Sequence, residues 1–287
     1  KELVWIFGCT IYLAMMAEGF LGYVLPYGQM SYWGAQVIIS LFGAIPYIGE
    51  SLELWVRGDY YISGITVSRF FALHVVALPL VLIALVFLHL VALHEVGAGN
   101  PEGVDIEEHL DEDGVPLDSV PFFPYKVLNA LVAIGVFMTV FSIIMFFFPE
   151  GGGYFIEMAN FQEANPLVTP EHIAPVWYYA PYYTMLRAIP DPLGGLIVMA
   201  AAVAIFFIVP WLDRSKVASI RYKGIFSKIA ITMFGVSFLT LGYLGTVGVT
   251  EVRKTMSVIC TIIYFAYFLL MPIYTKYETT KEVPERL

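Results

Sequence analysis

Six long apolar runs set the pattern of this chain of 287 residues. They cover about 3–25, 70–93, 127–148, 193–212, 225–243 and 256–274. Each run holds about 18 or more predominantly apolar residues, the length that a helix needs to cross roughly 30 Å of hydrocarbon. The sequence therefore predicts an all-α integral membrane protein, a bundle of six transmembrane helices.

Three interrupted or polar segments separate these spans. Residues 28–69 alternate apolar patches with Gly and Pro, which predicts amphipathic helices at the membrane surface. The aromatic residues expected at that interface are Tyr32, Trp33 and Trp55. Residues 95–125 are rich in Gly, Asp and Glu and predict an aqueous loop. Residues 149–192 carry seven prolines among aromatic residues, and such long loops are usually functional.

Composition and charge narrow the function classes. The chain is 59% hydrophobic and 14% charged, whereas about a quarter of a soluble domain is charged. Its net charge of −9 leaves no basic surface for phosphates, so nucleic acid is excluded as a partner. Cys9 and Cys260 form no Cys-x-x-Cys-His motif, which excludes covalent haem and leaves non-covalent haem open.

The distribution of Lys and Arg predicts the orientation. Five cations lie on the side of the segments 28–69 and 149–192, and ten lie on the side of the acidic loop. The ten are Lys1, Lys126, Arg214, Lys216, Arg221, Lys223, Lys228, Lys276, Lys281 and Arg286. By the positive-inside rule the side with ten cations, which includes the C-terminus, is cytoplasmic. Segments 28–69 and 149–192 then share the opposite, positive side of the membrane.

Two histidines inside the second span are the strongest chemical signal. Ionisable groups at this depth are costly, so a functional interpretation is the default for His74 and His89. Their spacing of fifteen residues separates them by roughly 22 Å and about 60° around the helix. Pro79 can kink or unwind the helix between them. The arrangement suits two haems, each held by a neutral imidazole, while a proton relay and histidines hydrogen-bonded only for structure stay open as alternatives.

Several long motifs resemble one family. They are residues 22–35, Ala-Ile-Pro-Tyr-Ile-Gly at 44–49, Arg69–Glu95, residues 165–178 and Leu-Arg-Ala-Ile-Pro-Asp-Pro-Leu-Gly-Gly at 186–195. Together they resemble cytochrome b of the quinol–cytochrome c reductase (bc1) complex, over nearly the whole chain. The resemblance identifies the six spans with the family's helices C to H. This identification implies that helices A and B are missing, and the start at Lys1 without an initiator Met also suggests a chain that lacks its beginning.

The resemblance also assigns the haems. It implies that His74 binds the low-potential b haem near the positive side and that His89 binds the high-potential b haem near the cytoplasm. Gly8 and Gly22 match positions where a haem face packs against helix C, although small residues also serve simple helix packing. Helix B carries the other two histidines, so this chain is expected to half-ligate each haem. The spacing of fifteen resembles b6-type proteins, which leaves a quinol–plastocyanin reductase relative as an alternative.

The resemblance places quinol oxidation on the positive side. The family signature Pro-Glu-Trp-Tyr reads Pro-Val-Trp-Tyr here, so Val176 replaces the carboxylate that accepts a proton. The residues expected to shape the pocket are Met30, Gly34, Trp177, Tyr178 and Tyr183. Glu18, one turn before Gly22, is the candidate substitute for the proton acceptor, with an ion pair to Arg69 or another buried cation as the structural alternative.

Quinone reduction is expected at the cytoplasmic end of the second span. His94 matches the family's histidine that contacts the quinone ring. The polar residues that accompany this histidine in the family are not matched here, because Ala98 replaces a Ser and the usual Asp has no clear counterpart.

The expected function is that of a cytochrome b subunit in a bacterial inner membrane, part of a proton-translocating ubiquinol–cytochrome c oxidoreductase. The resemblance implies a Rieske iron–sulfur protein, cytochrome c1 and a second copy of cytochrome b as partners, and ubiquinol and ubiquinone as ligands. We expect a haem-binding part at 1–94, an acidic cytoplasmic loop at 95–126, and a part at 127–287 that carries the quinol-site loop. A proton-coupled transporter using His74, His89 and Glu18, and a non-catalytic scaffold, are the other classes considered.

Overall fold

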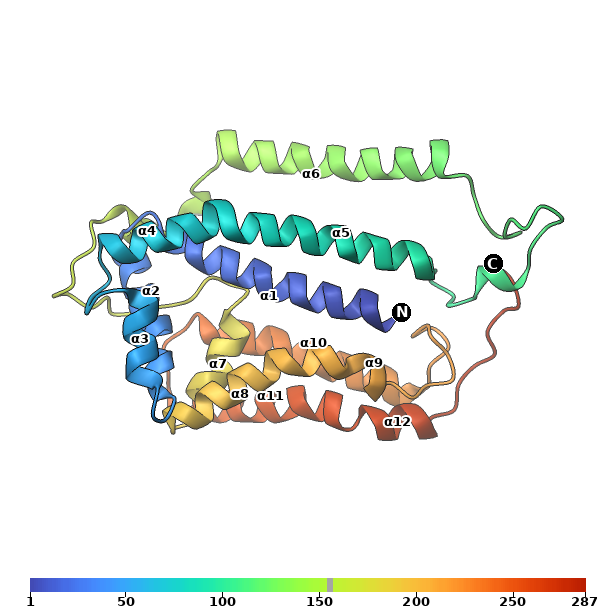
Figure 1. Ribbon diagram of the computed structural model, residues 1–287. Coiled ribbons are helices and arrows are strands. Elements are labelled where there is room, and N and C mark those ends of the chain that lie inside the picture. The colour runs from blue at the N-terminus through green and yellow to red at the C-terminus, as the bar shows by residue number, and fades with distance from the viewer. Residues whose placement is uncertain (154–156) are drawn as a thin grey trace.

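The computed structural model describes residues 1–153 and 157–287, and these residues contain helices and loops but no strand. Six helical segments are long and apolar enough to span a membrane, and they run roughly parallel (Figure 1). They are α1 (Glu2–Val24), Gly64–Val96, Phe122–Phe147, Pro192–Leu212, α10 (Ile225–Gly245) and α11 (Glu251–Leu269). The predicted all-α membrane bundle with six spans is confirmed.

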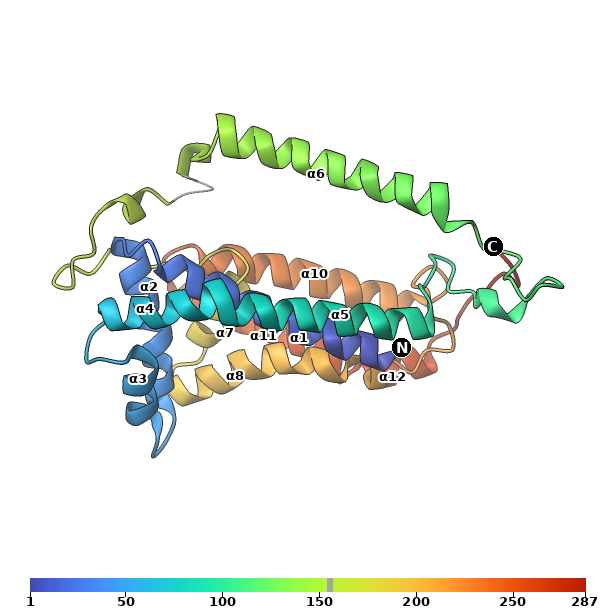
Figure 2. The ribbon, with the colours of Figure 1, turned by 45° about the horizontal axis from the view of Figure 1, so that its top comes forward.

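Three of the spans are built from consecutive helical segments. Phe122–Phe147 joins a π-helical turn (Phe122–Lys126) and α6 (Val127–Phe147). Gly64–Val96 joins α4 (Gly64–Ala72), a π-helical turn (Leu73–Ala77) and α5 (Leu78–Val96). Pro192–Leu212 joins α8 (Pro192–Ala204), a 3₁₀ turn and α9 (Val209–Leu212). The span of α6 (Val127–Phe147) has no buried residue and stands apart from the other helices (Figures 1 and 2).

Local capping moves two span boundaries away from the expected ones. The second span begins at Gly64 rather than near 70, because Ser63 forms a capping box with Thr66. The last span, α11, begins at Glu251 rather than near 256, because Thr250 caps it by accepting a hydrogen bond from the Arg253 backbone N–H. It ends at Leu269, and the short α12 (Met271–Tyr277) follows.

The segment 28–69 lies across one end of the bundle (Figure 1). It contains α2 (Gln29–Ser40), α3 (Gly49–Arg57) and the start of α4. Trp55 is 73% exposed, as expected of an interface residue, but Tyr32 is only 5% exposed. Tyr32 packs edge-on against the rings of Tyr27 and Trp33, so its expected place at the interface was wrong.

Hydrogen bonds join the start of α2 to the loop at 158–168. The Ser31 backbone N–H donates to Asn160 Oδ1 at 2.8 Å, and Asn160 Nδ2 donates to Ser31 Oγ at 2.8 Å. The Asn165 backbone N–H donates to Gln29 Oε1 at 2.7 Å. The two segments that the sequence assigned to one side of the membrane therefore meet directly.

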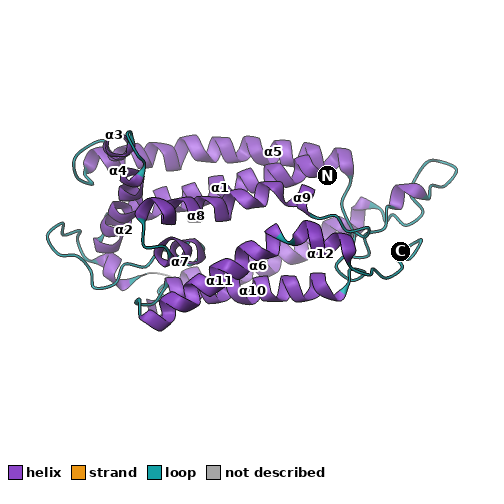
Figure 3. Ribbon diagram, turned by 90° about the horizontal axis from the view of Figure 1, so that it is seen from below, coloured by secondary structure: helices purple, strands orange, loops and turns teal. Residues whose placement is uncertain are grey.

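Two clusters of buried hydrophobic side chains pack the helices together. One lies between α7 (Ala180–Ala188), α8, α10 and α11, and the other lies between α1, α2 and α4. In Figure 3 the pair α1 and α5 lies on one side and the pair α10 and α11 on the other, with α7 near one end. Side chains of α1, α5, α7 and α10 line one cavity of the candidate site.

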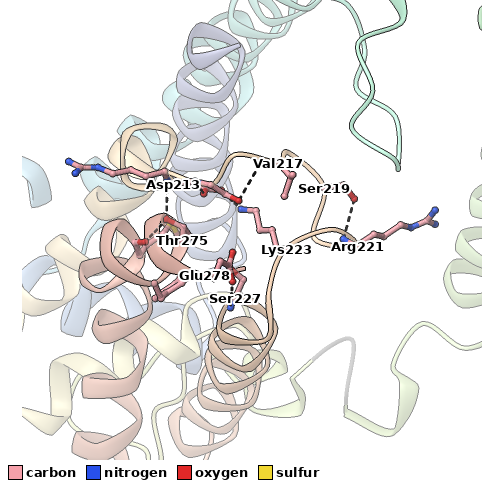
Figure 4. Close-up of polar contacts among 12 residues, drawn as sticks. Asp213, Val217, Ser219, Arg221, Lys223, Ser227, Thr275 and Glu278 are labelled. Carbon is pink, nitrogen blue, oxygen red and sulfur yellow. Dashed lines mark hydrogen bonds and ion pairs between the residues drawn. The ribbon is translucent and has the colours of Figure 1, made fainter. Parts of the chain in front are cut away.

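A polar network closes the opposite end of the bundle (Figure 4). Lys223 forms an ion pair with Asp213, and Ser227 Oγ donates to Glu278 Oε1 at 2.7 Å. Further contacts bring the acidic loop to the same end, through Arg221 with Glu102 and Arg286 with Asp118. The acidic loop, the loop before α10 and the C-terminal tail therefore share one end, as the charge distribution predicted.

Candidate functional site

His74 lies in the π-helical turn that precedes Pro79. A proline inside a helix has no N–H to donate and crowds the carbonyl four residues earlier. The backbone widens there into the π turn, a local form often found at functional sites. The predicted unwinding near Pro79 is confirmed.

The ring of His74 is held between two residues of α1. Its Nδ1 lies 3.0 Å from the backbone oxygen of Glu18 and 3.0 Å from Glu18 Oε1. A carbonyl only accepts hydrogen bonds, so Nδ1 carries the proton and Nε2 is left for a ligand. The ring rests on Gly22, where an added Cβ would lie 2.5 Å from His74 Cε1. Glu18 therefore pairs with His74 and not with Arg69, whose Nη1 donates to the Trp55 carbonyl at 3.0 Å.

His89 has a different environment. It faces Gly8, where an added Cβ would lie 3.5 Å from His89 Cε1, an ordinary contact distance. Its Nδ1 is buried and has no hydrogen-bond partner among the described residues. The ring lines a cavity of about 1060 Å³, together with Gly8 and Cys9 of α1 and Phe234 and Phe238 of α10.

These two environments fit non-covalent b-type haem. In each histidine Nε2 makes no hydrogen bond with the described residues and is available for an axial bond, and each ring faces a glycine on the neighbouring helix. The described residues contain no group of three or more His, Cys, Asp or Glu that could hold a metal ion. A haem iron needs only axial ligands from the protein, because the porphyrin supplies the other four nitrogens.

A second cavity, of about 440 Å³, lies where α1, α2, α7 and α8 meet. Its walls include Met16 and Phe20 of α1, Gly34 of α2, Val176 and Tyr183. The walls are almost entirely apolar and aromatic, as in most small-molecule sites. The cavity thus joins the segments 28–69 and 149–192, and Val176 lies where the family motif has its carboxylate.

Three of the residues expected in this pocket lie elsewhere. Met30 is 3% exposed and lines neither cavity. Trp177 is 80% exposed and, like Tyr178, lines the larger cavity instead. The Tyr178 hydroxyl packs against Gly19, where any side chain would collide with it.

Glu18 also lies away from the 440 Å³ cavity. It is two residues from Met16 and from Phe20, which both line that cavity. Two helical residues correspond to a rotation of about 200°, which puts Glu18 on the opposite side of α1. The carboxylate faces His74 of the neighbouring span.

Sequence reasoning missed two tyrosines of this site. The Tyr179 hydroxyl donates to the Met16 carbonyl, and Tyr179 lines the 440 Å³ cavity. The Tyr182 hydroxyl lies 2.9 Å from that of Tyr12, and Tyr182 lines both cavities. Burial raises the pKa of Tyr179 and of Tyr182, so both are neutral near pH 7. In the sequence, the run of aromatic residues after Pro175 is the signal that could have identified these two tyrosines.

His94 is exposed near the end of α5 and lines neither cavity. Its assignment to quinone reduction stays a prediction.

Comparisons with family models cover nearly the whole chain. Residues 1–181 match the model described as cytochrome b(N-terminal)/b6/petB. Residues 163–265 match the model described as cytochrome b(C-terminal)/b6/petD.

Individual proteins give the same result. The chain is 52% identical to cytochrome b of Allochromatium vinosum over 295 residues, which cover 100% of this chain and 71% of the relative. It is 44% identical to cytochrome b of Rickettsia bellii over 288 residues, which cover 100% of this chain and 69% of the relative. A solved structure titled hyperthermophilic respiratory Complex III superposes with a TM-score of 0.87 at 34% identity, covering 96% of this chain and 70% of that chain.

Proposed function

The chain belongs to the cytochrome b family, and from this premise we propose that it is the quinol-oxidising subunit of a bacterial respiratory complex III in which His74 and His89 each bind one b-type haem. The observation that carries the proposal is the pair of histidines at opposite ends of one span, each facing a glycine of α1. When bound, the haems carry single electrons across the membrane.

Quinol oxidation is assigned to the 440 Å³ cavity. Its volume falls within the usual range for small-molecule sites, roughly 300–1,000 Å³. Gly34 opens the wall of α2, since an added Cβ there would meet no atom within 4 Å, and Tyr183 closes the opposite wall. The Arg187 guanidinium carbon lies 4.4 Å from the centre of the Tyr183 ring and orients it by a cation–π contact.

The cavity offers no carboxylate among its lining residues to accept the quinol protons. Val176 has no basic group, and the Tyr179 hydroxyl is already bound to the Met16 carbonyl. A proton acceptor within hydrogen-bond reach is nevertheless required. We assign that role to the histidine of a Rieske protein, by family analogy, and to water.

The remaining assignments follow the family. The end that carries α2, α3 and α7 faces the positive side, and the end with the C-terminus faces the cytoplasm. Quinone reduction is assigned near His94, and the proposed partners are a Rieske protein, cytochrome c1 and a second copy of this subunit. The haem-binding part is 1–94, the cytoplasmic loop 95–126, and the remainder 127–287.

Redox-titrated difference spectra of the assembled complex test the haem assignment. We expect His74→Asn to lose the low-potential b component and His89→Asn to lose the high-potential one, because each loses an axial ligand. His109→Asn, in the acidic loop, is the matched control and keeps both components. If either span variant keeps both components, the assignment is wrong.

A further inference from the structure

A largely enclosed carboxylate beside only one of the two histidines is the feature that the proposed function leaves unexplained. Glu18 is 17% exposed and sits inside an apolar helix whose other acid, Glu2, lies at the very start. Charged groups at such depth are costly and need a partner. Among the described residues, the partner of Glu18 is His74, at 3.0 Å from Nδ1 to Oε1.

We propose that Glu18 is a positioning residue that binds the Nδ1–H of His74 and thereby lowers the reduction potential of the haem on that side; this rests on the proposed role of His74 as an axial ligand.

A carboxylate at this place acts in two ways. It fixes the ring and its tautomer, so that Nε2 is the nitrogen presented to iron. It also makes the imidazole more basic, and a more basic axial ligand stabilises the oxidised iron. His89 has no acceptor for its Nδ1 among the described residues, so only one of the two haems receives this effect. A single side chain thus widens the difference between the two reduction potentials.

The backbone oxygen of Glu18 accepts from the same Nδ1–H, and no substitution removes it. In Glu18→Gln this carbonyl still holds the ring, while the negative charge disappears. The variant therefore separates the electronic effect of the carboxylate from the placement of the ring.

The test is potentiometric titration of both b haems in the purified complex. In Glu18→Gln we expect two haems per subunit, an unchanged high-potential component, and a low-potential component that is easier to reduce. The expected change is about tenfold in its reduction equilibrium, or about 59 mV for a one-electron couple.

Glu157→Gln is the matched control. Glu157 accepts a hydrogen bond from the Tyr23 hydroxyl at 2.8 Å, so this variant removes one charge from the same end of α1 without touching His74. We expect the reduction potentials of both haems to be unchanged in this variant. An unchanged low-potential component in Glu18→Gln, or an equal rise in Glu157→Gln, overturns the proposal.

Two further variants keep the test decisive. If Glu18→Gln does not assemble, Glu18→Asp takes its place, because its shorter side chain weakens the contact; a smaller rise supports the proposal and no rise overturns it. His74→Asn separates the two levels of argument. If His74→Asn loses the low-potential haem while both Glu18 variants leave its reduction potential unchanged, only the proposed role of Glu18 is wrong. If His74→Asn keeps that haem, the proposed role of His74 as an axial ligand is wrong.

Discussion

In the π turn before α5, His74 donates to Glu18 and lies against Gly22, whereas His89, within α5, only touches Gly8 and has a buried nitrogen without an acceptor among the described residues. The same side chain on the same span is thus tightly fixed in one place and loosely held in the other. The difference teaches that the neighbouring helix alone can give two identical side chains different surroundings. It also predicts that equivalent substitutions at the two ends have unequal effects.

The largest expected effect is that of Gly22→Ala. The added methyl would lie 2.5 Å from His74 Cε1, so the ring has to move. A displacement of about 1 Å at a reacting centre can reduce the rate about 100-fold, and we expect a loss of this order in quinol oxidation together with loss of the low-potential haem signal. Haem spectra and steady-state turnover measure both.

Gly8→Ala is the equivalent change at the other end. Its methyl would lie 3.5 Å from His89 Cε1, an ordinary van der Waals contact. We expect both haems and most of the turnover to remain. If Gly8→Ala and Gly22→Ala reduced turnover and haem content equally, the proposed difference between the surroundings of His89 and His74 would be wrong.

A smaller effect is expected from Gly34→Val, which extends the comparison to the 440 Å³ cavity. The isopropyl group projects into the space that we assign to quinol. Overfilling a packed site costs about 1–3 kcal/mol, which corresponds to roughly a five- to 150-fold loss of quinol affinity. Gly64→Val is the control, since that position is also open but lines neither cavity. Turnover as a function of quinol concentration distinguishes them.

Val176→Glu changes the pH profile more than the rate. A carboxylate in an apolar cavity has a raised pKa, because burial disfavours its charged form. It accepts a proton only when ionised, so we expect the pH profile of quinol oxidation to gain one further titration step, with a lower rate below the pKa of the new carboxyl group than above it. An identical profile in both proteins would mean that the new group does not reach the quinol.

The smallest effect concerns the far end of the molecule. A hydrogen bond from Arg286 holds the pKa of Asp118 below its usual range. The contact therefore stabilises the tail above the ordinary Asp pKa and is lost as the pH falls through the lowered value. We expect hydrogen exchange of the C-terminal tail to rise at low pH, with both haem potentials unchanged. If the contact between Arg286 and Asp118 stabilises the tail, Asp118→Asn increases hydrogen exchange of the tail at neutral pH.

The spans and the two histidines could be predicted from the sequence, since hydropathy and the cost of buried ionisable groups are local properties. The π turn was also predictable, because Pro79 removes a donor wherever a helix contains it. The contact between Tyr12 and Tyr182 was not, since 170 residues separate them and only the packing of α7 against α1 brings them together. The places of Tyr32 and Trp177 were wrong for a related reason: aromatic residues in a surface segment do not reveal which of them turn inward.

The hydrogen bonds between α2 and the loop at 158–168 bear on how the protein is made. One wall of the 440 Å³ cavity is present once α1 and α2 have emerged, but the other wall follows more than 130 residues later, with Val176 and Tyr183. During synthesis the first wall therefore faces lipid or water until three further spans have inserted, the last of which contains α8. Contacts between such distant segments form slowly. Formation of the cavity thus marks the late stage of biogenesis, and a truncated chain that inserts normally still lacks the proposed quinol site.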